Sequence, residues 1–122
     1  MNENEEFVQE FLVECEENLD QIDQDLIALE QDPRDIDRLA SIFRAVHTIK
    51  GTSGFFGFSK LGAIAHVGEN LLSRLRDGEL LLDEETTTAL LDMVDAIREI
   101  ARCIEQAADE GTGDYRDLTT RI

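Results

Sequence analysis

Apolar side chains recur every three or four positions along four stretches of this chain, and polar side chains fill the positions between them. This spacing places the apolar residues on one face of an α-helix, whereas a half-buried β-strand needs alternation at every second position. The sequence shows no such alternation, no internal repeat and no low-complexity run. Its 122 residues are the length of one domain. The pattern therefore predicts an all-α fold, an antiparallel four-helix bundle.

The first two stretches are separated by the only proline of the chain. Asp32 precedes Pro33, and we expect its carboxylate to cap the next helix, because proline suits a first helical turn. The second helix is expected from about residue 35 to residue 55, where a glycine- and phenylalanine-rich turn closes the end of the bundle. The two apolar stripes are Phe7, Phe11, Cys15, Leu19, Ile22, Leu26 and Leu29, and then Leu39, Ile42, Phe43, Val46, Ile49 and Ser53.

Two further stretches complete the predicted bundle. Ser59 is a suitable N-cap for the third helix, which Asp77-Gly78 closes, and Asp83 opens the fourth. Their apolar stripes are Leu61, Ile64, Ala65, Gly68, Leu71, Leu72 and Leu75, and then Leu90, Leu91, Val94, Ile97, Ile100 and Ile104. The bundle is therefore expected in residues 1–111, ending at a glycine-rich turn, and residues 112–122 are expected to form a short C-terminal fifth helix or the start of a linker.

The charge balance excludes several classes of partner. Asp and Glu number 28 against 11 Lys and Arg, which gives a formal charge of −17. Nucleic-acid binding depends on clustered Lys and Arg, so neither nucleic acid nor an anionic membrane is expected as a partner. No apolar run approaches the roughly 20 residues that cross a bilayer. Because the first residues are acidic, they do not resemble a secretory signal, and we expect a cytoplasmic protein.

The two cysteines, Cys15 and Cys103, lie far apart in separate helical patterns. Neither has the CxxC spacing or the histidine partners that mark a redox or metal site. We therefore expect buried, reduced thiols rather than a disulfide or a metal site.

The only two histidines, His47 and His66, fall on the second and third predicted helices. At about 100° per residue, His47 lies on the water-facing shoulder of its helix, and Glu69 and His66 are turned in the same rotational sense on theirs. In an antiparallel hairpin with its midpoint at Phe58, residue 47 is level with residue 69, and residue 50 with residue 66. The spacing thus predicts one exposed polar patch with His66 at its outer margin. Its members are His47, Lys50, His66 and Glu69.

This patch has the composition of an exposed phosphate acceptor. The imidazole of His47 is a nucleophile that is uncharged near neutral pH, and a carboxylate such as Glu69 that accepts from Nδ1 leaves Nε2 free to react. Lys50, one helical turn along, places an ammonium group where an anionic group on His47 would need it. Gly51 and Gly54 remove side-chain bulk from the same side and leave room for a partner surface.

Other interpretations of the patch stay open on the residues alone. His47 is also compatible with an ordinary surface histidine, and Lys50 and Glu69 with solvated charges. His47, His66 and Glu69 have the ligand types of an open metal site, although such sites in bundles usually project into the interior rather than onto a shoulder. The sequence contains no glycine-rich phosphate loop and no nucleophile elbow, so we expect no ATP site in this chain.

The segment around the first histidine carries a recognisable motif. Residues 45–58 read AVHTIKGTSGFFGF, with HTIKG followed by a further glycine, and residues 66–72 continue with HVGENLL before a later Gly78-Glu79 turn. In these motifs, and over about residues 7 to 110, the chain resembles the histidine phosphotransfer (HPt) domain. The likeness is to the N-terminal HPt domain of chemotaxis sensor histidine kinases of the CheA type in particular.

That resemblance implies a phosphorelay of the two-component type. By it, His47 is the phosphorylated residue, Glu69 its hydrogen-bonded partner, and Lys50 and His66 members of the supporting network. His47 would take the γ-phosphoryl group of ATP from a separate kinase domain, in the same or a paired subunit, and pass it to an aspartate of a response-regulator receiver. ATP and magnesium would be held by that kinase domain, so this chain would itself bind no cofactor.

The resemblance also implies a larger parent protein. A chain of 122 residues cannot contain the dimerisation, ATP-binding and regulatory domains of such a kinase, so we expect a monomeric, excised fragment of a protein-histidine kinase. A free-standing phosphotransfer protein is the alternative origin. The alternative function is an acidic helical module that binds a protein partner without phosphotransfer. Replacing His47 by Gln would separate the two functions, because only phosphotransfer needs the imidazole.

Overall fold

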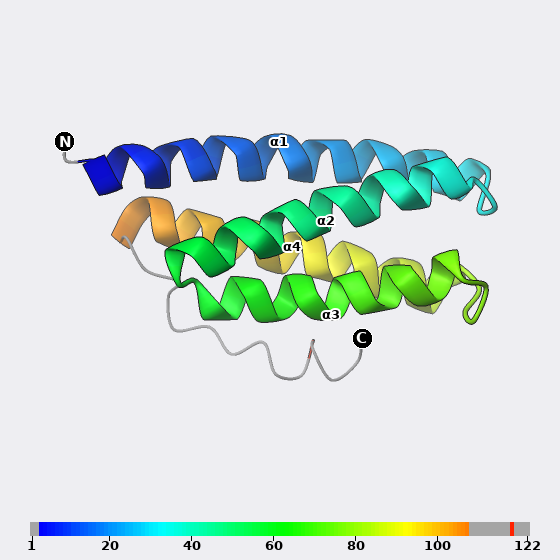
Figure 1. The fold of residues 1–122 in the computed structure, drawn as a ribbon. Helices are drawn as coiled ribbons and strands as arrows, with labels where there is room; N and C mark the ends of the chain where they lie inside the picture. The colour runs from blue at the N-terminus through cyan, green and yellow to red at the C-terminus, as the bar shows by residue number, and fades with distance from the viewer. Residues whose placement is uncertain (1–2, 108–117, 119–122) are drawn as a thin grey trace.

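The computed structural model describes residues 3–107 and residue 118, and all regular structure in those residues is α-helical. The helices of this part are α1 (Glu3–Gln31), α2 (Ile36–Phe56), α3 (Ser59–Arg76) and α4 (Glu84–Ala107). Figure 1 shows that each helix runs back along the one before it. Helix α4 packs against both α3 and α1 and so closes the bundle. The prediction of an all-α, antiparallel four-helix bundle is confirmed.

The predicted apolar stripes supply one continuous core, with two exceptions. Phe7 and Leu91, which the periodicity places in the stripes of α1 and α4, are exposed. Counting back in sevens along α1 from residue 29 arrives at Val8, which packs against the core in place of Phe7. On α4 the fully buried Met93 continues the stripe, and Leu91 lies beside it. The assignment is therefore wrong by one position on α1, and on α4 the stripe contains Leu90 and Met93 but not Leu91.

Helices α3 and α4 approach each other closely at Gly68. A Cβ atom at this position would collide with Sδ of Met93 and would lie 3.5 Å from its Cγ. Both residues are buried, so the space that the missing side chain leaves is filled by the methionine. The glycine in the predicted stripe of α3 is thus a packing residue.

The start of each helix differs in detail from the prediction. Asp35, and not Asp32, is the N-cap of α2, and its carboxylate accepts a hydrogen bond of 3.2 Å from the backbone N–H of Arg38. The carboxylate of Asp32 instead accepts from the backbone N–H of Arg34, inside the turn that carries Pro33. A turn therefore separates the proline from the helix, which moves the cap three residues along.

The caps of α3 and α4 give one correction and one confirmation. Ser59 is the first residue of α3 rather than its cap, and Phe58 occupies the cap position without a side-chain hydrogen bond. Asp83 accepts a hydrogen bond of 2.8 Å from the backbone N–H of Thr86 at the start of α4, as predicted. The hydrogen bonds from Thr86 hold the pKa of the Asp83 carboxyl below its ordinary value.

Aromatic rings close one end of the bundle, next to the turn between α2 and α3. Phe11 of α1 lies 5.3 Å from Phe56 and 5.6 Å from Phe58, measured between ring centroids. Phe55, by contrast, projects into solvent. Gly57 makes the turn with a φ of 75°, a left-handed conformation that glycine adopts without a steric penalty.

The remaining predictions concern the cysteines and the C-terminus. Cys15 is free and buried, and burial raises the pKa of its thiol to about 12, whereas Cys103 is free and only partly buried. Leu118 is buried against the core, but the rest of residues 112–122, and the glycines expected to end α4, lie outside the described residues. Among the described helices, none has an apolar stretch of the length needed to span a membrane.

Candidate functional site

The candidate site lies across the α2–α3 hairpin. Nδ1 of His47 on α2 is 3.3 Å from Oε1 of Glu69 on α3, within hydrogen-bond reach. The two residues are 22 positions apart in the chain and meet because the turn at Gly57 and Phe58 folds α3 back along α2. The predicted level of these two residues is therefore correct.

Glu69 is the centre of the site's charges. Its Oε2 lies 2.7 Å from Nζ of Lys50, so one carboxylate contacts both residues from α2. Oε2 is enclosed, and no group in the described residues meets it with hydrogen-bond geometry, so the contact with Lys50 is an ion pair. Burial acts to raise the pKa of Glu69, but the contacts with Lys50 and His47 outweigh it and hold this pKa below its usual value. Glu69 is therefore ionised at neutral pH.

An ionised Glu69 fixes the tautomer of His47. A carboxylate without a proton can only accept, so the hydrogen at the 3.3 Å contact belongs to Nδ1 of the imidazole. In the neutral ring this leaves a lone pair on Nε2. The His47 side chain is 61% exposed, whereas that of Glu69 is only 15% exposed and that of Lys50 30%. The site thus presents a reactive nitrogen at the surface and keeps its charged partners beneath it.

A second contact holds the His47 ring. Phe43, one turn earlier on α2, stacks on the imidazole with ring centroids 6.1 Å apart and planes within 8° of parallel. Cζ of Arg76, at the end of α3, lies 5.0 Å from the centroid of the Phe43 ring. The periodicity assigned Phe43 to the core stripe, and the structure places it at the edge of the stripe, partly buried, where its ring reaches the histidine. Its aromatic character was the one signal in the sequence for this contact.

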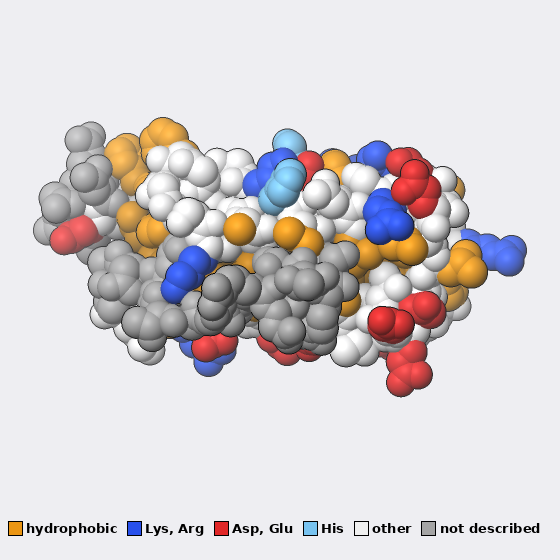
Figure 2. Space-filling model, turned by 90° about the horizontal axis from the view of Figure 1, so that it is seen from below, with side chains coloured by type: hydrophobic (Ala, Val, Ile, Leu, Met, Phe, Trp, Pro, Cys, Tyr) orange, Lys and Arg blue, Asp and Glu red, His pale blue; other side chains and the backbone are white. Residues whose placement is uncertain are grey.

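The surface beside His47 is open. A Cβ atom added at Gly51 or Gly54 would meet no other atom within 4 Å. Figure 2 shows histidine side chains next to a basic and an acidic side chain on one face of the molecule. The glycines therefore leave α2 uncovered by side chains close to the exposed imidazole.

His66 does not join this cluster through a hydrogen bond or ion pair within the described residues, and its side chain is exposed. The register predicts Lys50 level with His66, but the ammonium group turns to Glu69 instead. An ion pair with a largely enclosed carboxylate is stronger than a contact with a solvated imidazole, which accounts for this choice.

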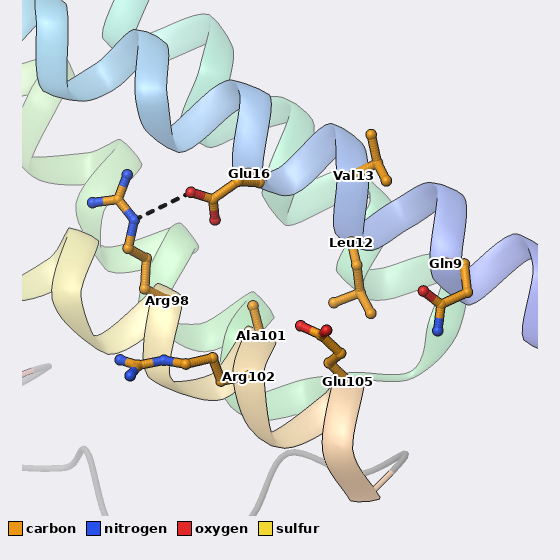
Figure 3. Close-up of a pocket in the computed structure, with 8 residues that line it drawn as sticks. All are labelled: Gln9, Leu12, Val13, Glu16, Arg98, Ala101, Arg102 and Glu105. Atoms are coloured by element: carbon orange, nitrogen blue, oxygen red, sulfur yellow. Dashed lines mark ion pairs between the residues drawn. The ribbon is translucent and has the colours of Figure 1, made fainter.

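A different cluster occupies the seam between α1 and α4. Arg98 lies 2.8 Å from Asp23, 3.1 Å from Asp20 and 3.7 Å from Glu16, and the hydrogen bond with Asp23 raises the pKa of its guanidinium. Figure 3 shows the open groove beside it, which Leu12 and other side chains of both helices line. This network ties the acidic α1 to α4 and contains no residue of the candidate site. No group of three or more His, Cys, Asp and Glu in the described part of the chain is arranged to hold a metal ion.

Comparison with known proteins shows the family of this chain. The family model of the Hpt domain matches residues 6–114. The sensor histidine kinase CheAY of Helicobacter pylori is 34% identical over 123 aligned residues, which cover all of this chain. The chemotaxis protein CheA of Klebsiella aerogenes is 40% identical over 93 residues, or 76% of the chain. The chain spans only 15% and 14% of the lengths of these two relatives.

Solved structures show the same fold. The CheA phosphotransferase domain from Thermotoga maritima aligns with a TM-score of 0.83 and 30% identity, over 86% of this chain and all of that domain. The phosphorylated P1 domain of CheA3 from R. sphaeroides, solved in complex with CheY6, aligns with a TM-score of 0.85 and 29% identity, over 95% of this chain and 91% of that one. This chain has a partly buried carboxylate within hydrogen-bond reach of an exposed histidine, and it has the expected helical fold. Because the family model also matches most of its length, this chain belongs to the Hpt domain family.

Proposed function

We propose that His47 is the phosphoacceptor of this Hpt domain, within a chemotaxis-type histidine kinase. The observation that carries the proposal is the hydrogen bond between Nδ1 of His47 and the ionised carboxylate of Glu69, which in the neutral ring leaves the lone pair on Nε2, at the surface. An idle surface histidine needs no such partner. The bond therefore favours a phosphoacceptor over a binding module whose histidine has no chemical role.

The proposed reaction is two successive phosphoryl transfers. The lone pair of Nε2 forms a bond to the γ-phosphorus of ATP while the bond from that phosphorus to the ADP oxygen breaks, and ADP leaves as an anion. The positive charge that develops on the ring is opposed by Glu69 through the Nδ1 hydrogen bond. In the second transfer an aspartate oxygen of a receiver attacks the same phosphorus, and the electron pair of the P–N bond returns to Nε2.

The neighbouring residues have supporting roles in this proposal. Lys50 neutralises the enclosed oxygen of Glu69, and its ammonium lies one helical turn from His47, where it opposes the charge of a phosphoryl group. Gly51 and Gly54 give a partner domain access to the histidine. Within the described residues no hydrogen bond or ion pair links His66 to the reacting nitrogen, so His66 serves as the internal control for His47.

The partners follow from the same proposal. The donor is the ATP-binding domain of a kinase, in the same or a paired subunit, and that domain holds ATP and magnesium. The acceptor is a response-regulator receiver, which the complex of a related P1 domain with CheY6 supports. Both partners act in the cytoplasm, where we place this domain as a monomeric part of a larger kinase.

The test is phosphorylation of the purified chain by ATP and a CheA-type catalytic core that lacks its own phosphotransfer domain. We expect the intact mass to rise by about 80 Da through an acid-labile bond, as for one phosphoryl group on nitrogen. His47→Gln should abolish the increase. His66→Gln, which removes the other histidine, should leave it intact.

Two outcomes would contradict the proposal. The first is a wild-type chain that stays unmodified although the same catalytic core phosphorylates a known Hpt domain. That result would favour a binding module. A mass increase that persists in His47→Gln and disappears in His66→Gln would move the acceptor to the other histidine.

A further inference from the structure

The hydrogen bond to Glu69 holds only one atom of the His47 ring. At 3.3 Å it fixes the position of Nδ1, but a planar ring that is held at one atom can still swing about that contact. With 61% of the His47 side chain exposed, solvent does not restrict such a swing. Nε2 is on the far side of the ring from the bond, so it would move most. A second constraint is needed to aim it.

The ring of Phe43 supplies this constraint. Its plane lies within 8° of the imidazole plane, at a centroid distance of 6.1 Å that falls in the usual range for offset-stacked aromatic pairs. Phe43 is partly buried against the core and therefore has little freedom itself. Contact between the two faces restricts rotation of the imidazole out of its plane, whereas the Glu69 bond restricts its translation.

We propose that Phe43 is a positioning residue for phosphoryl transfer, because its ring sets the plane of the His47 imidazole and thereby the direction of the Nε2 lone pair. This inference rests on the proposed function of His47. In-line displacement at phosphorus needs the attacking lone pair to be aligned with the bond that breaks. A misdirected ring would still bind the kinase domain but would react slowly.

Arg76 extends the arrangement to the end of α3. Its guanidinium lies over the Phe43 ring, 5.0 Å from the centroid, and its Nε is 3.5 Å from Oδ1 of Asp77. A cation over an aromatic face is attracted to it. Arg76 on α3 therefore restricts the motion of the Phe43 ring on α2. The imidazole is thus held by α3 twice, directly through Glu69 and indirectly through Arg76.

The experiment compares the chain with Phe43→Leu, Phe43→Tyr and the control Phe56→Leu. Leucine keeps apolar bulk but removes the ring, tyrosine restores the ring, and Phe56 is a ring of the same helix that packs at the end of the bundle. For Phe43→Leu we expect kcat for phosphoryl uptake from the kinase core to fall about five- to tenfold, with KM unchanged. Phe43→Tyr should restore kcat, and Phe56→Leu should leave it at the wild-type value.

A second measurement reads the ring directly, without a kinase. In the nuclear magnetic resonance spectrum, the two carbon-bound ring protons of His47 should shift in Phe43→Leu, through loss of the neighbouring ring current, and should return in Phe43→Tyr. Arg76→Gln should lower kcat by a smaller factor, about two- to threefold. Urea unfolding of all variants establishes that differences in kcat do not follow differences in stability.

The outcomes separate the two levels of the proposal. If the wild-type chain accepts phosphoryl groups and Phe43→Leu does so with the same kcat, the positioning role is wrong while the phosphoacceptor stands. If Phe56→Leu slows the reaction as much as Phe43→Leu, the effect is one of stability and the positioning role is again wrong. If the wild-type chain accepts none, the proposed function fails and this inference fails with it.

Discussion

The ammonium group of Lys50 lies 2.7 Å from Oε2 of Glu69, which makes the lysine a partner of the carboxylate before any phosphoryl group arrives. Glu69 is largely enclosed, and an enclosed charge without a counter-charge is costly. Lys50 therefore keeps Glu69 ionised, and the ionised Glu69 in turn holds the proton of His47 on Nδ1. The effect of Lys50 on the histidine is transmitted through the carboxylate.

This relationship gives the first prediction, on Lys50→Met. Removing the ammonium leaves Oε2 of Glu69 enclosed and unpaired, and we expect a loss of about 1–3 kcal/mol in the free energy of unfolding. The double variant Lys50→Met with Glu69→Gln should recover most of this stability but not the rate of phosphoryl uptake. Urea unfolding and uptake assays on the single and double variants form a complete cycle. Additive losses of stability would argue against the ion pair.

The second prediction concerns acid. The folded pKa of Glu69 is lower than its unfolded value of about 4.5, so the ionised group stabilises the fold above that value, and the contribution disappears as pH falls through the lower, folded pKa. Wild type should exceed Glu69→Gln in stability at neutral pH, and the difference should shrink in acid, as the pH falls below 4.5 and through the lower, folded pKa. Urea unfolding at neutral and at acid pH measures it. A difference that is the same at both would mean that the charge of Glu69 contributes nothing.

A matched pair of glycines on neighbouring helices gives the third prediction. Gly68→Ala places a methyl group against the fully buried Met93, and we expect a destabilisation of about 1–3 kcal/mol. Gly51→Ala meets no atom within 4 Å and should stabilise α2 by up to about 1 kcal/mol, since alanine favours helix. Thermal and urea unfolding compare the two. Equal effects of the two substitutions would contradict the close approach of α3 and α4.

The fourth prediction concerns a buried carboxylate away from the site. Asp25 on α1 is fully buried and accepts hydrogen bonds from Gln21 at 3.1 Å, Arg38 at 3.0 Å and Ser41 at 2.6 Å. Asp25→Ala should lower the free energy of unfolding by about 2–4 kcal/mol, because it leaves several donors without their acceptor. Phosphoryl uptake at a temperature where the variant is folded should stay at the wild-type rate. A slowed uptake there would show that the α1–α2 seam affects the site.

Much of the site can be read from spacing because it lies on one hairpin. Two antiparallel helices of equal rise place residues at equal distance from the turn side by side, so His47 and Glu69 are predictable once Phe58 is recognised as part of the turn. The other contacts of the site depend on side-chain rotamers, which residue spacing does not predict. Periodicity predicts a solvated Glu69, whereas Lys50 covers its carboxylate and leaves it largely enclosed.

In the fold, too, the sequence pattern predicts the helices but not the local contacts of individual side chains. The four apolar stripes predict the bundle, since a 3.6-residue period is repeated over many turns. The cap of α2 is not predictable in this way, because Asp32 and Asp35 are both good caps and only the geometry of the proline turn selects between them. Asp25 has the spacing of the buried face, three residues after Ile22 and four before Leu29, but a carboxylate there is expected to turn to solvent. Its burial depends on the hydrogen bonds that it accepts from α2, and these depend on how the two helices face each other.

The confinement of the site to α2 and α3 has a consequence for how this domain forms. The contacts of Glu69 with His47 and Lys50 span 22 positions or fewer, and that of Arg76 with Phe43 spans 33, whereas Arg98 must find Asp20 across 78. Because short loops close at little entropic cost, the α2–α3 hairpin and the hydrogen bond between His47 and Glu69 can form before α1 and α4 have docked. The other two helices then serve as a support that is in principle replaceable. A designed bundle that keeps the α2–α3 hairpin and replaces α1 and α4 by other helices with a matching apolar face should retain the site.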